Sequence, residues 1–154
     1  MDVFYYWKDM AEDRKHDRLG RFRSSKEKLN ELKANCPDRI WIFRTPPGQK
    51  GRLQLLGRLT WSDTPAVPFK PLPGESHILY KPDDPGSVWF EGSDDDALVD
   101  AVTLWVRTHF PTAVRANFQG ANGQHEMRGA VLQGLESIAQ RLAQRPFRPV
   151  VAPA

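Results

Sequence analysis

Aromatic side chains in strand-like segments, close to arginines, are the groups in this sequence best suited to binding chemistry. They lie in VFYYW and RIWIFR, and at the end of LQLLGRLTW. Aromatic rings stack on the face of a nucleobase, and guanidinium groups bind phosphate oxygens in a planar, bidentate way. The pattern therefore leaves two alternatives open: a base-binding pocket with a basic rim, or an aromatic core.

Alternation along the strands divides these aromatic residues. Tyr6 and Trp7 point to opposite faces of their segment, whereas Trp41 and Phe43 share one face. A small domain needs large apolar side chains in its core, so we assign Trp41 and Phe43 to the core. Tyr6, Trp7 and Trp61 are the predicted lining of a base-binding pocket.

A polar turn supplies one further pocket candidate. Asn117 begins the glycine-rich stretch NFQGANGQ, which precedes an expected helix. An amide side chain can read a base edge through paired hydrogen bonds, so Asn117 joins the predicted pocket. The turn itself explains the asparagine and the glycines equally well.

The predicted phosphate-binding residues are Arg21, Arg23, Ser24 and Arg58. Arg21 and Arg23 stand just before an expected helix N-terminus at Ser24, where free backbone N–H groups and the helix dipole favour a phosphate. Arg58 lies in the segment that also carries Trp61. An ordinary basic loop is the competing explanation for the first three.

The distribution of charge along the chain also favours binding to an anionic partner. Residues 1–58 hold 14 Lys and Arg against 8 Asp and Glu, whereas residues 59–154 hold 8 against 11. A basic half can present a face to an anionic partner such as DNA or RNA. A solvated surface whose charges mix on folding is the alternative.

The elements that must position these residues are strands first and helices last. We expect strands at 3–7, 39–45, 53–61, 76–81 and 87–91, and helices at about 25–35, 94–108 and 124–144. Residues 8–23 suit an exposed loop or irregular helix, and four prolines make 62–75 a crossing loop or an edge. This order predicts an α+β fold: a curved, partly closed, β-barrel-like sheet with flanking helices. Residues 1–146 are expected to form one domain, followed by a proline-rich tail at 147–154.

The sequence lacks the motifs that are typical of several classes of enzyme. It lacks the standard nucleophile, metalloprotease, phosphate-loop and dinucleotide motifs, and its four histidines have no metal-ligand spacing. A turn and a helix cap account for most of the acidic residues at 83–100. No catalytic residue, metal or cofactor is therefore predicted. With one cysteine, no apolar run of about 20 residues and no signal-peptide pattern, we expect a cytoplasmic protein without a membrane partner.

The order of these segments is similar to that of the PUA-like superfamily, in particular its EVE, ASCH and YTH-like branches. The similarity spans residues 3–63. It rests on the opening strand with Tyr6 and Trp7, the basic stretch after it, and the strand pair RIWIFR and LQLLGRLTW with Gly57. It implies a compact β-barrel that binds nucleic acid and holds a flipped base, modified or not, between aromatic side chains. It also implies that Tyr6, Trp7 and Trp61 line that pocket, while Arg21, Arg23 and Arg58 face the backbone.

Three functions follow as expectations. The leading one is a non-catalytic nucleic-acid-binding domain that recognises a base. An ASCH-like ribonuclease is the second, and it would cleave RNA with the help of a metal or a histidine. The third is a protein-interaction accessory module that uses the last helix or the proline-rich segment.

Overall fold

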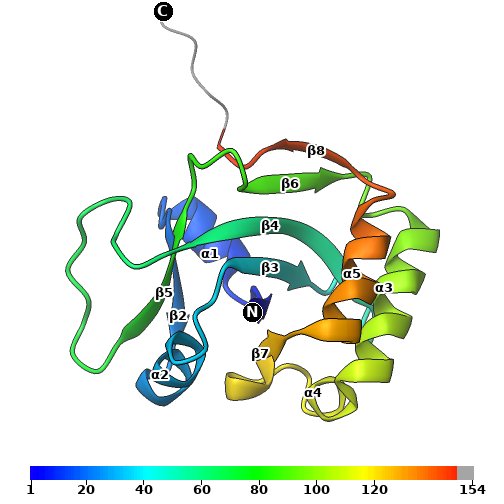
Figure 1. Ribbon diagram of the computed structural model, residues 1–154, viewed down its shortest axis with the longest axis horizontal. Helices are drawn as coiled ribbons and strands as arrows, with labels where there is room; N and C mark the ends of the chain where they lie inside the picture. The colour runs from blue at the N-terminus through cyan, green and yellow to red at the C-terminus, as the bar shows by residue number, and fades with distance from the viewer. Residues whose placement is uncertain (149–154) are drawn as a thin grey trace, which may run out of the picture.

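The computed structural model describes residues 1–148, in which eight strands join into one strongly curled sheet (Figure 1). The strands are β1 (Asp2–Tyr6), β2 (Arg21–Ser24), β3 (Arg39–Arg44), β4 (Gln54–Ser62), β5 (Ser76–Lys81), β6 (Val88–Glu91), β7 (Gln124–Met127) and β8 (Ala143–Pro146). The main order is β2-β5-β4-β3-β1-β7, and β6 pairs with both β4 and β8. β1 and β3 are parallel, and the other pairs are antiparallel. The result is an open half-barrel.

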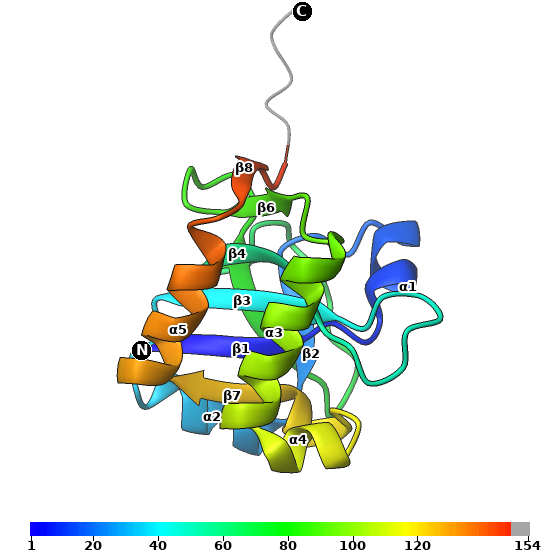
Figure 2. The same cartoon turned by 90° about the vertical axis from the view of Figure 1, so that its right-hand side faces the viewer.

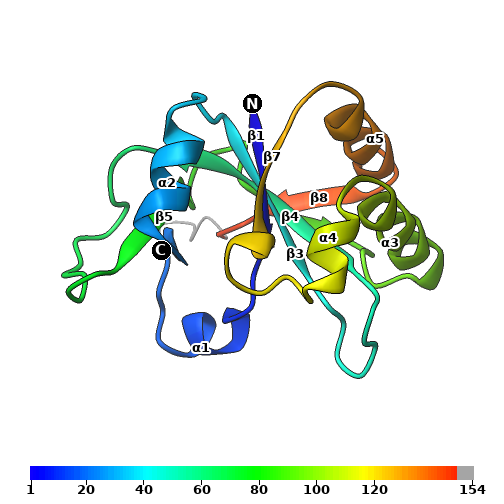
Figure 3. The same ribbon diagram turned by 90° about the horizontal axis from the view of Figure 1, so that it is seen from below.

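Helices cover the half-barrel on both sides. They are α1 (Met10–Lys15), α2 (Lys26–Lys33), α3 (Asp96–His109), α4 (Pro111–Arg115), the 3-10 turn η1 (Gly120–Gly123) and α5 (Gly129–Ala139). α3 and α5 lie side by side against one face of the sheet (Figure 2), while α2 lies on the other side, beside β5 (Figure 3). The expected α+β class, with a curved, partly closed sheet and flanking helices, is confirmed at this level.

Each face of the sheet carries its own core, which explains why the central strands are apolar throughout. Trp41 and Phe43 pack under α3 and α5, whereas Ile40 and Ile42 of the same strand lie inside the curl. A strand covered on both faces reads as a continuous apolar run. The assignment of Trp41 and Phe43 to the core is confirmed, since both are fully buried.

The curl depends on a close approach between β4 and β6 at Gly57. The register of β4 against β3 shifts by one residue between Ile42 and Phe43, which is the position of a β-bulge. A bulge bends the strand and increases its local twist. A Cβ atom on Gly57 would collide with the main-chain oxygen of Val88, so only glycine lets β6 pair at this bend.

The expected helix at 124–144 is confirmed only in its middle, over Gly129–Ala139. The structure has β7 there, then α5, and then β8, which pairs with β6. Gln124 to Met127 pairs with β1, and Gly129 adopts a positive φ of 54° where α5 begins. An apolar stripe with helical spacing does not show that the first residues of the segment pair with β1 as a strand.

Two other segments are more ordered than expected. Residues 8–23, expected as a loop or irregular helix, contain α1 and most of β2, which pairs with β5. The expected tail at 147–154 begins with Phe147, whose ring is buried. Residues 149–154 of that tail lie outside the described residues. In the part of the chain that is described, no helix has the length and apolarity to cross a membrane.

Candidate functional site

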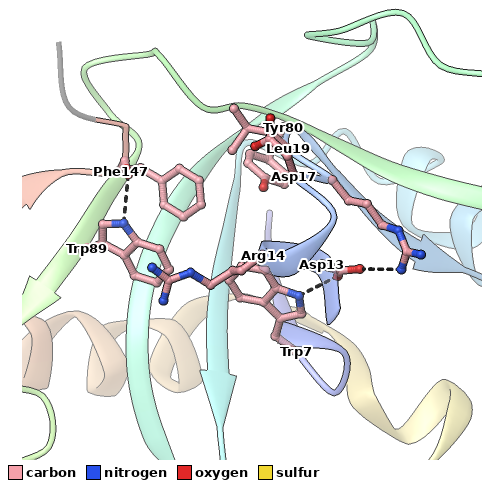
Figure 4. A pocket seen from close by; sticks show the side chains of 9 residues that line it. Trp7, Asp13, Arg14, Asp17, Leu19, Tyr80, Trp89 and Phe147 are labelled. Atoms are coloured by element: carbon pink, nitrogen blue, oxygen red, sulfur yellow. Dashed lines mark hydrogen bonds and ion pairs between the residues drawn. The ribbon is translucent and has the colours of Figure 1, made fainter. Parts of the chain in front are cut away.

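A pocket walled by aromatic rings opens beside α1, and we call it the aromatic pocket (Figure 4). Its volume is about 190 Å³. It is lined by Trp7, Asp13, Arg14, Asp17, Arg18, Leu19, Tyr80, Trp89 and Phe147. The four aromatic residues follow or belong to β1, β5, β6 and β8, so the curl of the sheet brings them together.

Trp89 is the central wall of the aromatic pocket. Its indole stacks on the ring of Phe147 with 4.6 Å between centroids, and it lies nearly parallel to the indole of Trp7 at 6.2 Å. Trp89 Nε1 donates a hydrogen bond of 2.9 Å to the main-chain oxygen of Phe147. Trp89 is partly exposed, whereas Trp7 and Phe147 are buried. The buried ring of Phe147 thus fixes the orientation of the partly exposed Trp89 indole, which is a flat apolar surface in the pocket.

Asp13 is the one carboxylate of the pocket that is buried. Its Oδ2 accepts a hydrogen bond of 2.8 Å from Trp7 Nε1, and its Oδ1 accepts one of 3.3 Å from Arg18. An ionised carboxylate offers about four acceptor sites, so Asp13 keeps capacity for a donor in the pocket. Burial raises the pKa of Tyr80, also in the wall, to about 12.

Two arginines stand at the rim, next to the indole of Trp89. The guanidinium carbons of Arg14 and Arg145 each lie 5.8 Å from the centroid of that ring. This is within the distance at which a cation is attracted to an aromatic face. Both arginines are exposed, so their donors remain accessible to an anionic group at the mouth of the pocket.

A second cavity of about 170 Å³, the basic pocket, adjoins the first. It is lined by Asp13, Arg18, Arg21, Arg23, Phe69, Lys70, Leu72, Glu75 and His77, so the two pockets share Asp13 and Arg18. The guanidinium of Arg21 lies 4.3 Å above the ring of Phe69. Burial lowers the pKa of His77 below its ordinary value of 6.5, and the nearby Glu75 opposes this shift.

The structure brings three of the predicted site residues near each other. Trp7 lines the aromatic pocket, and Arg21 and Arg23 line the basic pocket beside it. Tyr6 and Asn117 share a different, shallow cavity with residues 45–51. Tyr6 and Asn117 therefore lie together but apart from Trp7. In that cavity the ring of Tyr6 stacks on the ring of Phe118 with 4.6 Å between centroids.

The other predicted residues line neither pocket. Trp61 is buried inside the curl, and its Nε1 donates to Asp63. Ser24 donates a hydrogen bond of 2.7 Å to Gln124, while the adjacent Ser25 caps α2. Arg58 lies 5.2 Å above the ring of Trp41, on the side of the sheet that faces α3. Burial lowers the pKa of Arg58, and its Nε is buried without a hydrogen-bond partner in the described residues.

Sequence reasoning missed most of the aromatic pocket. Asp13, Arg14 and Arg18 belong to the charged segment that was expected to be a loop or irregular helix. Trp89 carries the same signal as the predicted residues, an aromatic side chain on a short strand, and could have been found by it. Phe147 could not, because its partner is a strand 58 positions earlier in the chain.

Comparisons with protein-family models, with curated proteins and with solved structures find no match to this chain. Within residues 1–148, no three His, Cys, Asp or Glu side chains are grouped in a way that could hold a metal ion.

Proposed function

We propose that this protein is a nucleic-acid-binding domain that takes one base of DNA or RNA into the aromatic pocket. The observation that carries the proposal is the wall formed by Trp89, Phe147 and Trp7, with Arg14 at its rim. Stacking of one base on an aromatic side chain contributes about 1–3 kcal/mol, which offsets much of the few kcal/mol needed to unstack that base.

The pocket also offers a means of choosing among bases. The free acceptor capacity of Asp13 suits a base that carries an exocyclic amino group, such as cytosine or adenine. A volume of about 190 Å³ is below the roughly 300–1,000 Å³ of pockets for drug-sized ligands. A pocket of this size suits a single base, and a modification on that base would meet the walls directly.

The PUA-like assignment is part of the same proposal. The open half-barrel, the opening strand that ends at Tyr6 and is followed by Trp7, and the bend at Gly57 support it. Within this fold we propose Trp7, Trp89 and Phe147 as the base-stacking residues, with Arg21 and Arg23 for phosphate. Tyr6 with Asn117 forms the competing candidate pocket, at the shallow cavity.

Binding of fluorescent oligonucleotides, modified and unmodified, to paired variants tests the proposal. Trp89→Ala and Tyr6→Ala each remove a half-buried aromatic side chain, one from the aromatic pocket and one from the shallow cavity. We expect Trp89→Ala to weaken binding about tenfold or more, and Tyr6→Ala to leave it unchanged. The reverse result would move the site to the shallow cavity. No binding by the unaltered protein, even at low salt, would remove nucleic acid from its function.

An RNA-cleaving enzyme is the second candidate function, and the position of His77 in the basic pocket favours it. His77 lies in the basic pocket with Arg21 and Arg23, and its lowered pKa keeps it neutral at pH 7, as a general base requires. Cleavage of an RNA oligonucleotide that is lost in His77→Gln would support this candidate. An intact RNA with intact binding, with and without Mg²⁺, would exclude it.

A further inference from the structure

A third cavity adjoins the aromatic pocket through lining residues that it does not share with the basic pocket, and we call it the β6 cavity. Its volume is about 380 Å³. It is lined by Met10, Arg14, Arg44, Gln54, Leu56, Trp89, Phe90, Glu91, Gly92, Ser93, Asp94 and Arg145. Arg14 and Trp89 also line the aromatic pocket, so they are a wall common to both.

Shared walls therefore connect three cavities in a fixed order. Asp13 and Arg18 join the basic pocket to the aromatic pocket, and Arg14 and Trp89 join the aromatic pocket to the β6 cavity. We propose that these cavities form one track for an extended single strand of nucleic acid. The strand places one base in the aromatic pocket and its flanking phosphates in the basic pocket and the β6 cavity. This inference rests on the proposed function and extends it.

The charges along the track support a phosphate backbone on both sides of the base. Seven basic side chains line the three cavities, namely Arg14, Arg18, Arg21, Arg23, Arg44, Lys70 and Arg145. Arg18 pairs with Asp13, and none of the other six forms an ion pair within residues 1–148. These six arginine and lysine side chains are therefore available to an external anion.

The acidic side chains that line the track do not cancel the positive charge of its basic side chains. Asp13 is neutralised by Arg18, and Glu75 accepts a hydrogen bond from the main-chain N–H of Leu72. Asp17, Glu91 and Asp94 are exposed to solvent. Seven basic side chains against five carboxylates leave the lining of the three cavities with a net charge of +2, which favours an anionic ligand.

The order of the cavities favours a single strand over a duplex. The aromatic pocket lies between two other recesses, so the backbone must enter the protein surface on both sides of the bound base. In a duplex the flanking nucleotides stay paired and stacked, and one base alone turns out of the helix. A flexible single strand follows the recesses without losing flanking base pairs. A mononucleotide, in contrast, leaves the outer cavities unused.

Oligonucleotide length and the salt dependence of binding test the track. The ligands are a mononucleotide, a single-stranded hexamer and the same hexamer within a duplex, each as DNA and as RNA. The variants are Arg21→Gln with Arg23→Gln at one end, and Arg44→Gln with Arg145→Gln at the other. Lys26→Gln with Lys33→Gln is the control, because it removes two exposed cations from α2, outside the three cavities.

We expect the single-stranded hexamer to bind at least about tenfold more tightly than the mononucleotide or the duplex. Each end variant should reduce the salt dependence of hexamer binding by about 1.4 in log K against log salt, since each removed phosphate contact contributes about 0.7. The control should not change it. Melting temperatures equal to that of the unaltered protein establish that each variant is folded.

The outcomes separate the track from the proposed function. If the mononucleotide binds as tightly as the hexamer and Trp89→Ala abolishes both, base binding stands and the track is wrong. If duplex binds as well as single strand, the single-strand assignment is wrong. If no ligand binds at all, the proposed function fails together with the track.

Discussion

The indole of Trp89 and the ring of Phe147 stack at 4.6 Å, and the Trp89 Nε1 donates to the Phe147 main-chain oxygen at 2.9 Å. Stacking and hydrogen bond together fix the position of a residue next to the end of the described chain. They can form because β8 pairs with β6, which brings Phe147 next to Trp89. The wall of the aromatic pocket therefore combines Trp7 from the start of the sequence with Trp89 from its middle and Phe147 from its last part.

Phe147→Ala should weaken base binding and destabilise the fold. Trp89 loses its stacking partner, and truncating a buried phenylalanine costs up to about 3–5 kcal/mol. Chemical denaturation of Phe147→Ala, Trp89→Ala and the double variant measures the coupling between the rings, which we expect to be about 0.5–1.5 kcal/mol. A coupling near zero would mean that Phe147 does not support Trp89.

Asp13→Asn should change base preference more than overall affinity. The amide keeps the size of the side chain and one acceptor, but it removes the charge that faces Arg18 and the second acceptor oxygen. We expect the preference for amino-bearing bases to fall about tenfold in competition binding, since one good base-edge contact discriminates by about 1–3 kcal/mol. An unchanged preference would place the reading of the base edge elsewhere in the pocket.

Trp61→Ala should destabilise the protein without a specific effect on the aromatic pocket. Trp61 is 7% exposed and belongs to the core inside the curl, although it was predicted to line a pocket. Removing a buried tryptophan costs about 3–5 kcal/mol. The measurement is the free energy of unfolding in urea, with binding compared at a temperature where the variant is fully folded. Loss of binding by a folded variant would restore Trp61 to the site.

Gly57→Ala should destabilise the fold by at least about 1–3 kcal/mol, the typical cost of overpacking. The added methyl group meets the main-chain oxygen of Val88, and backbone yields less readily than a side chain. Separation of β6 from β4 would also displace Trp89, so binding should weaken as well. Gly48→Ala is not a suitable control, because Gly48 has a positive φ of 73°. Gly134→Ala, which meets only side-chain atoms of Trp105 at 3.4 Å, is the better comparison.

Stability should decline as the pH falls from 7.5 to 5.5. Burial lowers the pKa of both His77 and His125 below the ordinary 6.5, so the folded state binds protons less readily than the unfolded state does. Below about pH 6.5 the unfolded state therefore gains protons first, and the free energy of unfolding decreases with falling pH. Well above pH 6.5 both states are largely neutral at these histidines, so their contribution to stability is constant there.

The variant His125→Gln isolates this effect. His125 Nε2 lies 2.7 Å from the main-chain oxygen of Asn122, and a glutamine amide can donate the same hydrogen bond without titrating. We expect a shallower decline in the free energy of unfolding between pH 7.5 and 5.5 than in the unaltered protein. His16→Gln, at an exposed position, controls for the loss of a histidine as such. An identical decline in His125→Gln would assign the pH dependence to other groups.

Local sequence patterns were enough to predict those strands whose side-chain alternation is complete within a few residues. Alternation in RIWIFR and LQLLGRLTW predicted β3 and β4, and the segments on either side of the turn before Val88 were predicted as the strands β5 and β6. The assignment of Trp41 and Phe43 to the core followed from the same periodicity. Such signals suffice because period-two alternation is a local consequence of strand geometry.

Which aromatic side chains contact each other depends on the pairing of distant strands, and this could not be predicted from the sequence. Tyr6 and Trp7 are neighbours in sequence, yet strand geometry sends them to opposite faces and so to different cavities. Trp61 has the same composition signal as Trp89 and belongs to the core against which Trp89 packs, yet it does not line the aromatic pocket, since the direction of a side chain depends on register and on the bulge in β4. Phe147 reaches the pocket through a strand pairing that bridges more than fifty residues, and a long-range pairing leaves no mark in the local sequence.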